Sequence, residues 1–319
     1  MKTLEDLRHF YLTDLSADLK VLEKKRRNVL QKLTSVGITL LCLVGVVVII
    51  MLLNPHIDRG FIMVPIVISI IIGALACKFI SKDYITEFKG IVIERIVHFI
   101  DKDLNYNHTG YIPKSTFILS QIFKTKPNRY KGDDFVSGRV GETKIQLCEL
   151  NAEYESGSGK NRSTRTVFKG LFFIGDFNKD FTCQTIVLPD AAEKFLGRIG
   201  QKLQSINLAR DKLVKLDDPE FEKYFVVYSN DQVGARYILS TSLMKRIVDF
   251  KKKSNRNIHL SFVGSMVFVA ISYTRNLFEP RIFRTLLDFE PIRKYFEDLR
   301  LAIGIVDDLN LNTRIWTKR

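Results

Sequence analysis

Two uncharged apolar runs constrain this chain more than any other feature of its sequence. Val36–Leu53 continues for 18 residues and Phe61–Cys77 for 17 without a charged side chain. A helix needs about 17–25 predominantly apolar residues to cross a bilayer core of about 30 Å. The sequence therefore predicts two membrane-spanning helices joined by a short turn, and it argues against a fully soluble protein.

The charges that flank the two runs predict their orientation. Residues 20–32, just before the first run, hold six cations and one anion, and Lys78 and Lys82 follow the second run. The turn 54–60 carries one charge of each sign. Short segments rich in Lys and Arg stay in the cytoplasm. We therefore expect both termini to be cytoplasmic and the pair to act as a hairpin anchor rather than a pore, which would need charged groups inside the runs.

Residues 1–34 are polar but contain an apolar pattern with heptad spacing. Its members are Leu12, Leu15, Leu19, Leu22, Val29 and Leu33, and Arg26 interrupts it. This spacing predicts one amphipathic helix that continues into the membrane. Two roles remain open for its apolar face: packing on the protein's own soluble domain, or self-association as a coiled coil.

Residues 81–319 are expected to form a cytosolic domain, after a cytosolic amphipathic helix (1–34) and a transmembrane hairpin (35–80). Apolar residues on one helical face between Ile85 and Phe99 predict a stalk helix that leaves the membrane. Segments rich in β-branched and aromatic residues predict strands: 135–140, 143–154, 165–175, 182–188, 225–229, 258–263 and 266–273. Helical spacing follows at 191–203, 219–224, 241–253 and 291–309. Runs of strands followed by mixed elements predict an α+β fold with a largely antiparallel sheet.

Two loops imitate known ligand-binding motifs but depart from them. Gly157-Ser158-Gly159-Lys160 lacks the first glycine and the final Ser or Thr of a phosphate-binding loop, so we expect a hairpin tip. Asp176–Asp180 begins like a calcium loop, but Phe181 and Val187 stand where that loop needs Gly and Glu. A turn between strands explains the same Asp and Asn residues.

No catalytic, cofactor-binding or metal-binding residue is identified from the sequence. The five histidines are scattered, and Cys148 and Cys183 lie in predicted strands, where small buried side chains are the default. An enzyme remains the alternative. It would require Asp176, Asp180, Arg236 and Tyr237 to converge in one cleft.

Basic clusters are the stronger signal, since the chain has 49 Lys and Arg against 35 Asp and Glu, a net charge of +14. The largest cluster comprises Lys245, Arg246, Lys251, Lys252, Lys253 and Arg256. A solvated helix face is the simplest interpretation. Beside a membrane, the same cluster is a candidate contact for an anionic leaflet. Nucleic acid is not the expected partner, because no nucleic-acid motif accompanies the charge.

Several segments of the soluble region resemble one uncharacterised family of bacterial membrane proteins, domain-of-unknown-function family 3137. They are Phe168–Phe173, Asp176–Lys179 with Leu188–Asp190, Asp218–Lys223, Val226–Ser229 and Ala235–Leu239. The resemblance extends over about residues 84–316. Cys183 and Gly234 depart from the pattern, which has Gly and an acidic residue at these places. The resemblance implies a bacterial inner membrane and a LemA-type membrane protein as a candidate partner. It implies no activity and no catalytic residue.

Together these features predict a membrane-anchored cytosolic binding or adaptor module without a cofactor. Its expected partners are the lipid bilayer and an unidentified protein. A membrane-proximal hydrolase or transferase is one alternative, and an oligomeric membrane scaffold formed through the N-terminal helix is another.

Overall fold

The computed structural model of the 319-residue chain describes residues 2–54, 61, 63–178, 180–190 and 212–313. It has two compact units, which are described separately. Residues Met1–Arg95 and Phe278–Lys294 form the first, and Ile96–Leu277 and Tyr295–Arg319 form the second. The helix expected over 191–203 and most of the turn 54–60 lie outside the described residues. The expected boundaries after residues 34 and 80 follow membrane topology and stay a prediction.

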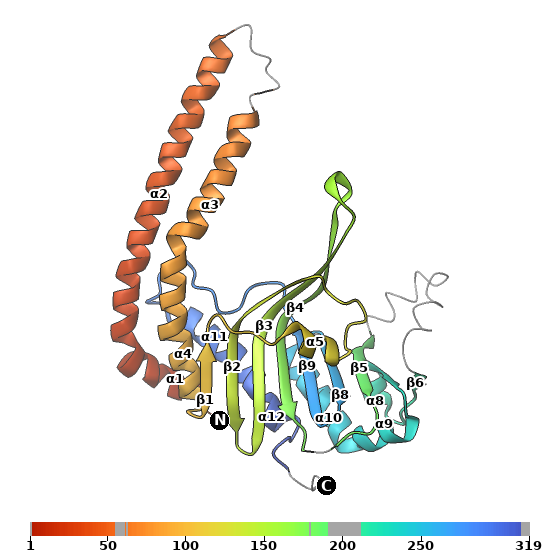
Figure 1. Cartoon of the computed structure of the whole chain (residues 1–319). Coiled ribbons are helices and arrows are strands. Elements are labelled where there is room, and N and C mark those ends of the chain that lie inside the picture. The colour runs from red at the N-terminus through yellow and green to blue at the C-terminus, as the bar shows by residue number, and fades with distance from the viewer. Residues whose placement is uncertain (1, 55–60, 62, 179, 191–211, 314–319) are drawn as a thin grey trace. The chain divides into compact units, whose positions relative to one another are not determined.

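The first unit contains two long helices (Figure 1). The first runs without a break from Leu4 to Leu53. It consists of α1 (Leu4–Phe10), the π-helical turn η1 (Tyr11–Leu15) and α2 (Ser16–Leu53). The second consists of α3 (Met63–Phe88), the π-helical turn η3 (Lys89–Ile93) and α4 (Glu94–Ile100), whose last residues enter the second unit.

Both long helices have the length and composition needed to cross a membrane. The most apolar 18-residue window of each has a mean hydropathy of 3.1 and 2.4, and none of either window is buried within the protein. This confirms the two apolar helices expected from the sequence. Burial in the protein core therefore does not explain their apolar character.

The N-terminal amphipathic face is buried in the structure. Leu15, Leu19 and Leu22 have no exposed surface, whereas Leu12, expected on the same face, is 62% exposed. The π-helical turn adds a residue to the helical repeat at Tyr11–Leu15, which rotates Leu12 away from the buried face. The interrupting Arg26 is buried as well and hydrogen-bonds to the segment 278–294.

The second unit contains one nine-stranded antiparallel sheet with the order β1-β2-β3-β4-β9-β8-β5-β7-β6. The strands are β1 (Leu104–Asn107), β2 (Arg129–Val140), β3 (Thr143–Ser156), β4 (Ser163–Asp176), β5 (Thr185–Pro189), β6 (Lys212–Val214), β7 (Phe225–Ser229), β8 (Ile258–Val263) and β9 (Met266–Ser272). The α+β class and the antiparallel sheet are therefore confirmed.

Of the first four strands expected from the sequence, three are neighbours in the sheet and the fourth is not. Strands β2, β3 and β4 pair in sequence order. The strand expected over 182–188 is β5, and it pairs with β7 and β8 instead of β4. Strand β9 pairs with the other edge of β4, where Val267 lies opposite Gly175. The hairpin turn at Gly264 (φ +62°) connects β8 to β9, so β8 is the next strand in the sheet.

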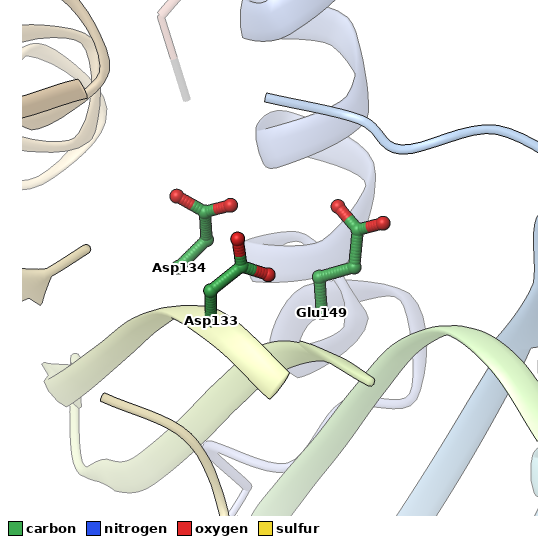
Figure 2. Close-up of side chains that lie close together, drawn as sticks. All are labelled: Asp133, Asp134 and Glu149. Carbon is green, nitrogen blue, oxygen red and sulfur yellow. The ribbon is translucent and has the colours of Figure 1, made fainter. Parts of the chain in front are cut away.

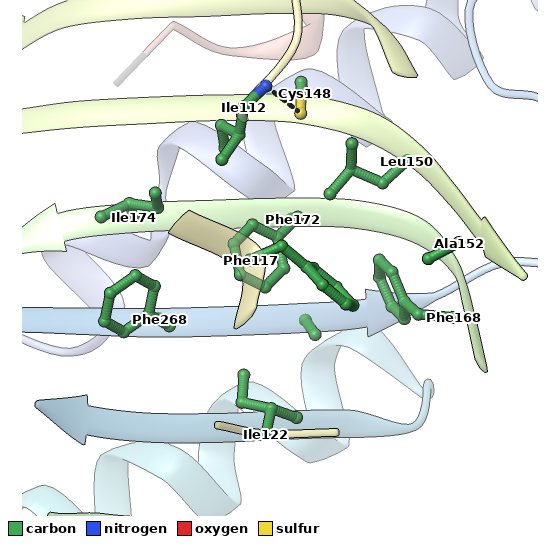
Figure 3. Packing of buried hydrophobic residues seen from close by; sticks show 11 residues of the cluster. Ile112, Phe117, Ile122, Cys148, Leu150, Ala152, Phe168, Phe172, Ile174 and Phe268 are labelled. Carbon is green, nitrogen blue, oxygen red and sulfur yellow. Dashed lines mark hydrogen bonds between the residues drawn. The ribbon is translucent and has the colours of Figure 1, made fainter. Parts of the chain in front are cut away.

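Both faces of the sheet are covered near its centre, since β8, β9 and the part of β4 from Phe168 to Gly175 are largely buried. Helix α5 (Lys114–Leu119) lies in front of the sheet in Figure 1. There Phe117 packs on Phe168 and Phe172, with ring centroids 6.1 and 5.2 Å away (Figure 3). The remaining helices are α8 (Pro219–Glu222), α9 (Gln232–Ile238), α10 (Thr241–Ser254), α11 (Phe289–Ile303) and α12 (Ile305–Asp308).

Candidate functional site

An acidic cluster lies at a β-bulge between β2 and β3. Asp133 is the direct cross-strand partner of Glu149, and the register shifts between Asp133 and Val136. Asp134 occupies this bulge with φ at +56°, a conformation that Asp and Asn tolerate better than other residues with side chains. The bulge brings the Asp134 carboxylate beside those of Asp133 and Glu149 (Figure 2).

The three carboxylates are close together and shielded from water. One oxygen from each lies within 4.8 Å of the others, and Asp134 and Glu149 are buried while Asp133 is half-buried. The hydroxyl of Tyr106 in β1 donates to Oδ1 of Asp134. The backbone N–H of Leu277 donates to Oε2 of Glu149 at 2.9 Å.

These residues have the ligand chemistry of a hard divalent cation, since Mg²⁺ and Ca²⁺ prefer carboxylate oxygens. Asp133, Asp134 and Glu149 are the residues that could hold such an ion. The same carboxylates also connect the sheet to its surroundings. Asp134 joins β1 to the bulge through Tyr106, and Glu149 fixes the chain at Leu277, five residues after β9.

The sequence analysis missed this cluster, although the sequence contains a signal for it. The hairpin turn is set by Val140 pairing with Thr143. Counting back from this turn without a bulge places Asp134 opposite Glu149, and the one-residue bulge adds Asp133 to the same place. Counting the strand register from the hairpin turn could therefore have predicted that two adjacent aspartates lie opposite a glutamate.

Cys148 lies beside the cluster in sequence but faces the hydrophobic core. Its Sγ accepts a hydrogen bond from the backbone N–H of Ile112 at 3.3 Å. Burial raises the pKa of the Cys148 thiol, and the nearby carboxylates raise this pKa further. The thiol therefore stays protonated at neutral pH and is a poor nucleophile. Cys148 and Cys183 are both buried, as expected for small apolar side chains.

The structure separates the basic cluster of α10 into paired and unpaired members. Lys252 binds Glu220 and Lys253 binds Asp308, each at 2.6 Å. Lys251 donates to the backbone carbonyl of Arg256, and burial lowers the pKa of this lysine.

The remaining members of that cluster have other surroundings. The Arg256 guanidinium stacks over the ring of Tyr273 with its Cζ 4.1 Å from the centroid. Lys245 is exposed and Arg246 is half-buried, and neither forms an ion pair with the residues that the structure describes. Lys245 and Arg246 are thus the members with charge to offer a partner.

The residues named for an enzyme lie on three separate elements. Asp176 ends β4, Asp180 follows it in the next loop, and Arg236 and Tyr237 lie on α9. Asp176 accepts the backbone N–H of Asn178, and Arg236 donates to the carbonyl of Lys215. The first contact stabilises a local turn, and the second joins α9 to the segment after β6.

The two loops that imitate ligand motifs are turns, as expected. Gly157–Lys160 lies at the tip of the β3–β4 hairpin and leads into a single 3₁₀ turn, Gly159–Asn161. Asn178, inside the expected calcium-like segment, has φ at +55°, and the Asp176 side chain caps its N–H. Both arrangements satisfy backbone amides.

Comparisons with known proteins give a match to one family model and identify no activity. Residues 166–311 match the model of a family described as "Protein of unknown function (DUF3137)". This confirms the resemblance over those residues, within the range 84–316 expected for it. No curated protein matches the sequence.

One solved structure is similar at a low level. It is the crystal structure of the mycobacterial trehalose monomycolate transport factor A, TtfA, with 9% sequence identity and a TM-score of 0.34. The alignment covers 67% of this chain and 95% of that one. A likeness at this TM-score establishes neither a shared fold nor a shared function.

Proposed function

We propose that this protein is a membrane-anchored binding module of a bacterial inner membrane. In this proposal α2 and α3 span the bilayer, both termini are cytoplasmic, and the sheet-containing unit binds a protein partner. The observation that carries the proposal is the exposure of the most apolar windows of both long helices, none of which is buried within the protein. Side chains such as Leu41 and Leu53, 75% and 79% exposed, require lipid around them.

The β3–β4 hairpin supplies the element we assign to partner binding. Strand β2 pairs with β3 only as far as Glu153, and β9 pairs with β4 only from Gly170 onward. The outer part of the hairpin therefore extends beyond both neighbouring strands as an arm (residues 154–165), which projects from the sheet in Figure 1. Tyr154 is 41% exposed on it. Free strand edges and exposed aromatic rings are features that protein partners use.

Ion pairs hold this arm in place without a partner. Glu155 binds Arg129 at 2.9 Å and also pairs with Arg162 across the arm. The Asn128 side chain continues the pairing of β2, since its amide group donates to the Glu155 carbonyl and accepts from the Glu155 N–H. A preorganised arm loses less conformational entropy when it binds.

Cysteine labelling tests the membrane topology. With a membrane-impermeant maleimide on intact spheroplasts, Asn54→Cys should react from outside, whereas Leu12→Cys and Thr313→Cys should react only after permeabilisation. These three positions are exposed in the structure. Reaction of Leu12→Cys in intact spheroplasts would reject the proposed topology.

A shortened arm tests partner binding. Replacing Ser156–Ser163 by Asn-Gly closes the hairpin between Glu155 and Thr164, which are already cross-strand partners. A photo-crosslinker at Tyr154 should capture a LemA-type membrane protein, and the shortened arm should lose that protein during copurification. A crosslinker at exposed Leu119 is the matched control. Copurification that survives arm removal would reject the arm as the binding element.

An oligomeric scaffold has one observation in its favour. A Cβ atom added to Gly37 or Gly45 of α2 would meet nothing within 4 Å, so both glycines face outward on this helix. Small residues allow close approach of helices in membranes. Native mass spectrometry of the full chain in detergent distinguishes a monomer from an oligomer. The hydrolase or transferase alternative stays a prediction.

A further inference from the structure

The first unit contains a turn whose tip carries an exposed phenylalanine between two arginines. Residues Arg281–Arg284 form this turn, with the Arg284 N–H donating to the Arg281 carbonyl at 3.2 Å. Phe283 is 75% exposed, and both arginines are exposed as well. We call this segment the arginine turn.

The arginine turn is fastened to the N-terminal helix. The buried guanidinium of Arg26 donates from Nη1 to the Ile282 carbonyl at 2.6 Å. Glu23, buried beside Arg26, accepts the Leu286 N–H at 3.0 Å. The hydroxyl of Tyr11 donates to the Leu287 carbonyl at 2.8 Å. These three bonds fix the turn relative to the N-terminal helix within the same compact unit.

The position of these contacts along the N-terminal helix determines how far the turn lies from the apolar run. Arg26 precedes Val36, the first residue of the apolar run, by ten residues of continuous helix, which is about 15 Å at 1.5 Å per residue. The headgroup layer extends about 5–8 Å beyond the hydrocarbon core. The turn therefore lies within about one Debye length, about 8 Å at physiological ionic strength, of the headgroups.

The charge around the turn favours anionic headgroups. Six exposed cations near the turn form no ion pair with the residues that the structure describes. They lie on α2, α3 and the segment 278–294: Lys24, Lys32, Lys78, Lys82, Arg281 and Arg284. Asp83 is the exposed acid in the same part of α3. Glu23 and Glu87 are engaged by Arg26, Arg27 and Lys25. The net charge of these exposed groups on α2, α3 and the arginine turn is therefore positive.

We propose that the arginine turn binds anionic phospholipids of the bilayer that α2 and α3 span, with the side chains of Arg281 and Arg284 extended toward the phosphates and Phe283 at the outer edge of the headgroup layer. This inference rests on the proposed membrane anchor. It assigns a lipid contact to the segment 278–294. The sequence does not indicate this contact, because the segment lies more than 200 residues after the apolar runs.

Tryptophan fluorescence tests the proposal on the full chain. The single native Trp316 is first replaced by Phe, and Phe283→Trp then reports on the turn. The protein is reconstituted in phosphatidylcholine, alone or mixed with phosphatidylglycerol, with lipids brominated near the headgroup as quenchers. We expect quenching of the tryptophan introduced by Phe283→Trp in the anionic mixture. We also expect loss of this quenching with Arg281→Glu and Arg284→Glu, or in about 1 M salt, where the Debye length falls to about 3 Å.

Two matched positions make the outcomes distinguishable. Leu12→Trp, exposed on the same helix but farther from the apolar run, should stay unquenched. Leu43→Trp, exposed within the run, should be quenched in every bilayer with deep bromines. If Leu43→Trp is quenched and Phe283→Trp behaves like Leu12→Trp, or responds equally in phosphatidylcholine alone, the lipid contact is overturned while the anchor stands. If Leu43→Trp is also unquenched, the anchor itself is overturned.

Discussion

The Sγ atom of Cys183 lies 2.6 Å from the position that a Cβ atom would take on Gly234. These are the two positions at which the sequence departs from the pattern expected from the family resemblance. A thiol at 183 and a hydrogen atom at 234 share one packed space between the loop before β5 and helix α9. The Cys183 side chain therefore occupies space that a side chain at 234 would need.

Substitution of Gly234 should show this shared space. Alanine is favoured over glycine within a helix by about 1 kcal/mol, yet we expect Gly234→Ala to lower the free energy of unfolding by about 1–3 kcal/mol, because its Cβ would lie 2.6 Å from Sγ of Cys183 and 2.7 Å from Oδ2 of Asp231. Cys183→Gly in the same chain should restore the part of the loss that comes from the thiol. Urea unfolding of the four variants measures the coupling.

Gly90→Ala is the control for this cycle, because its added Cβ would meet nothing within 4 Å. Additive effects of the Gly234 and Cys183 substitutions would contradict the shared space.

Glu23 should make the first unit sensitive to acid. Hydrogen bonds from Arg26 lower the pKa of Glu23 from 4.5 to about 2, against the opposing effect of burial. Because the folded-state pKa is the lower one, the contribution to stability is complete above about pH 4.5 and is lost as the pH falls through 2. A shift of this size corresponds to about 3 kcal/mol.

Hydrogen exchange of the Leu286 amide, which binds Glu23, measures this loss between pH 5 and pH 2 after correction for intrinsic exchange. Glu23→Gln should be less stable at neutral pH, by about 3–5 kcal/mol, because it leaves the Arg26 charge buried without its partner. Its exchange should also lose the pH dependence in this window. An unchanged pH dependence in Glu23→Gln would assign the effect to another group.

Glu149 should stabilise the sheet through the Leu277 amide. Glu149→Ala leaves that buried N–H without an acceptor, which costs about 1–3 kcal/mol, whereas Glu149→Gln keeps an acceptor oxygen and should cost less. Thermal unfolding of both variants, with and without EDTA, separates this bond from cation binding. Stabilisation of the native chain by Mg²⁺ or Ca²⁺ that Glu149→Gln abolishes would instead show that the acidic cluster holds an ion.

Lysine acylation should distinguish the members of the basic helix. In nanodiscs that contain phosphatidylglycerol, Lys245 should be protected from an acylating reagent relative to zwitterionic nanodiscs, because it has no carboxylate partner in the described structure. Lys252 and Lys253 should react equally in both lipids, since Glu220 and Asp308 hold them. Equal reactivity of Lys245 in both lipids would leave it an ordinary solvated residue.

Local patterns determined much of this fold. The apolar runs predicted the long helices because an uncharged stretch of 17 or 18 residues is a property of the chain itself. Strand β7 coincides with the segment expected at 225–229, and Asp218, the residue before Pro219, caps α8 through its side chain. Periodicity and capping act within a few residues, so the sequence shows them directly.

The tertiary structure decided what joins distant segments. Nothing near Arg26 in the sequence indicates that its partner is the Ile282 carbonyl, and β5 lies beside β7 and β8 because β9 occupies the edge of β4. The acidic cluster depends on a bulge of one residue, which changes which side chains share a face. Packing and burial select such pairings over long sequence separations. Many partners satisfy the local pattern, but only one pairing buries the polar groups and also forms their hydrogen bonds.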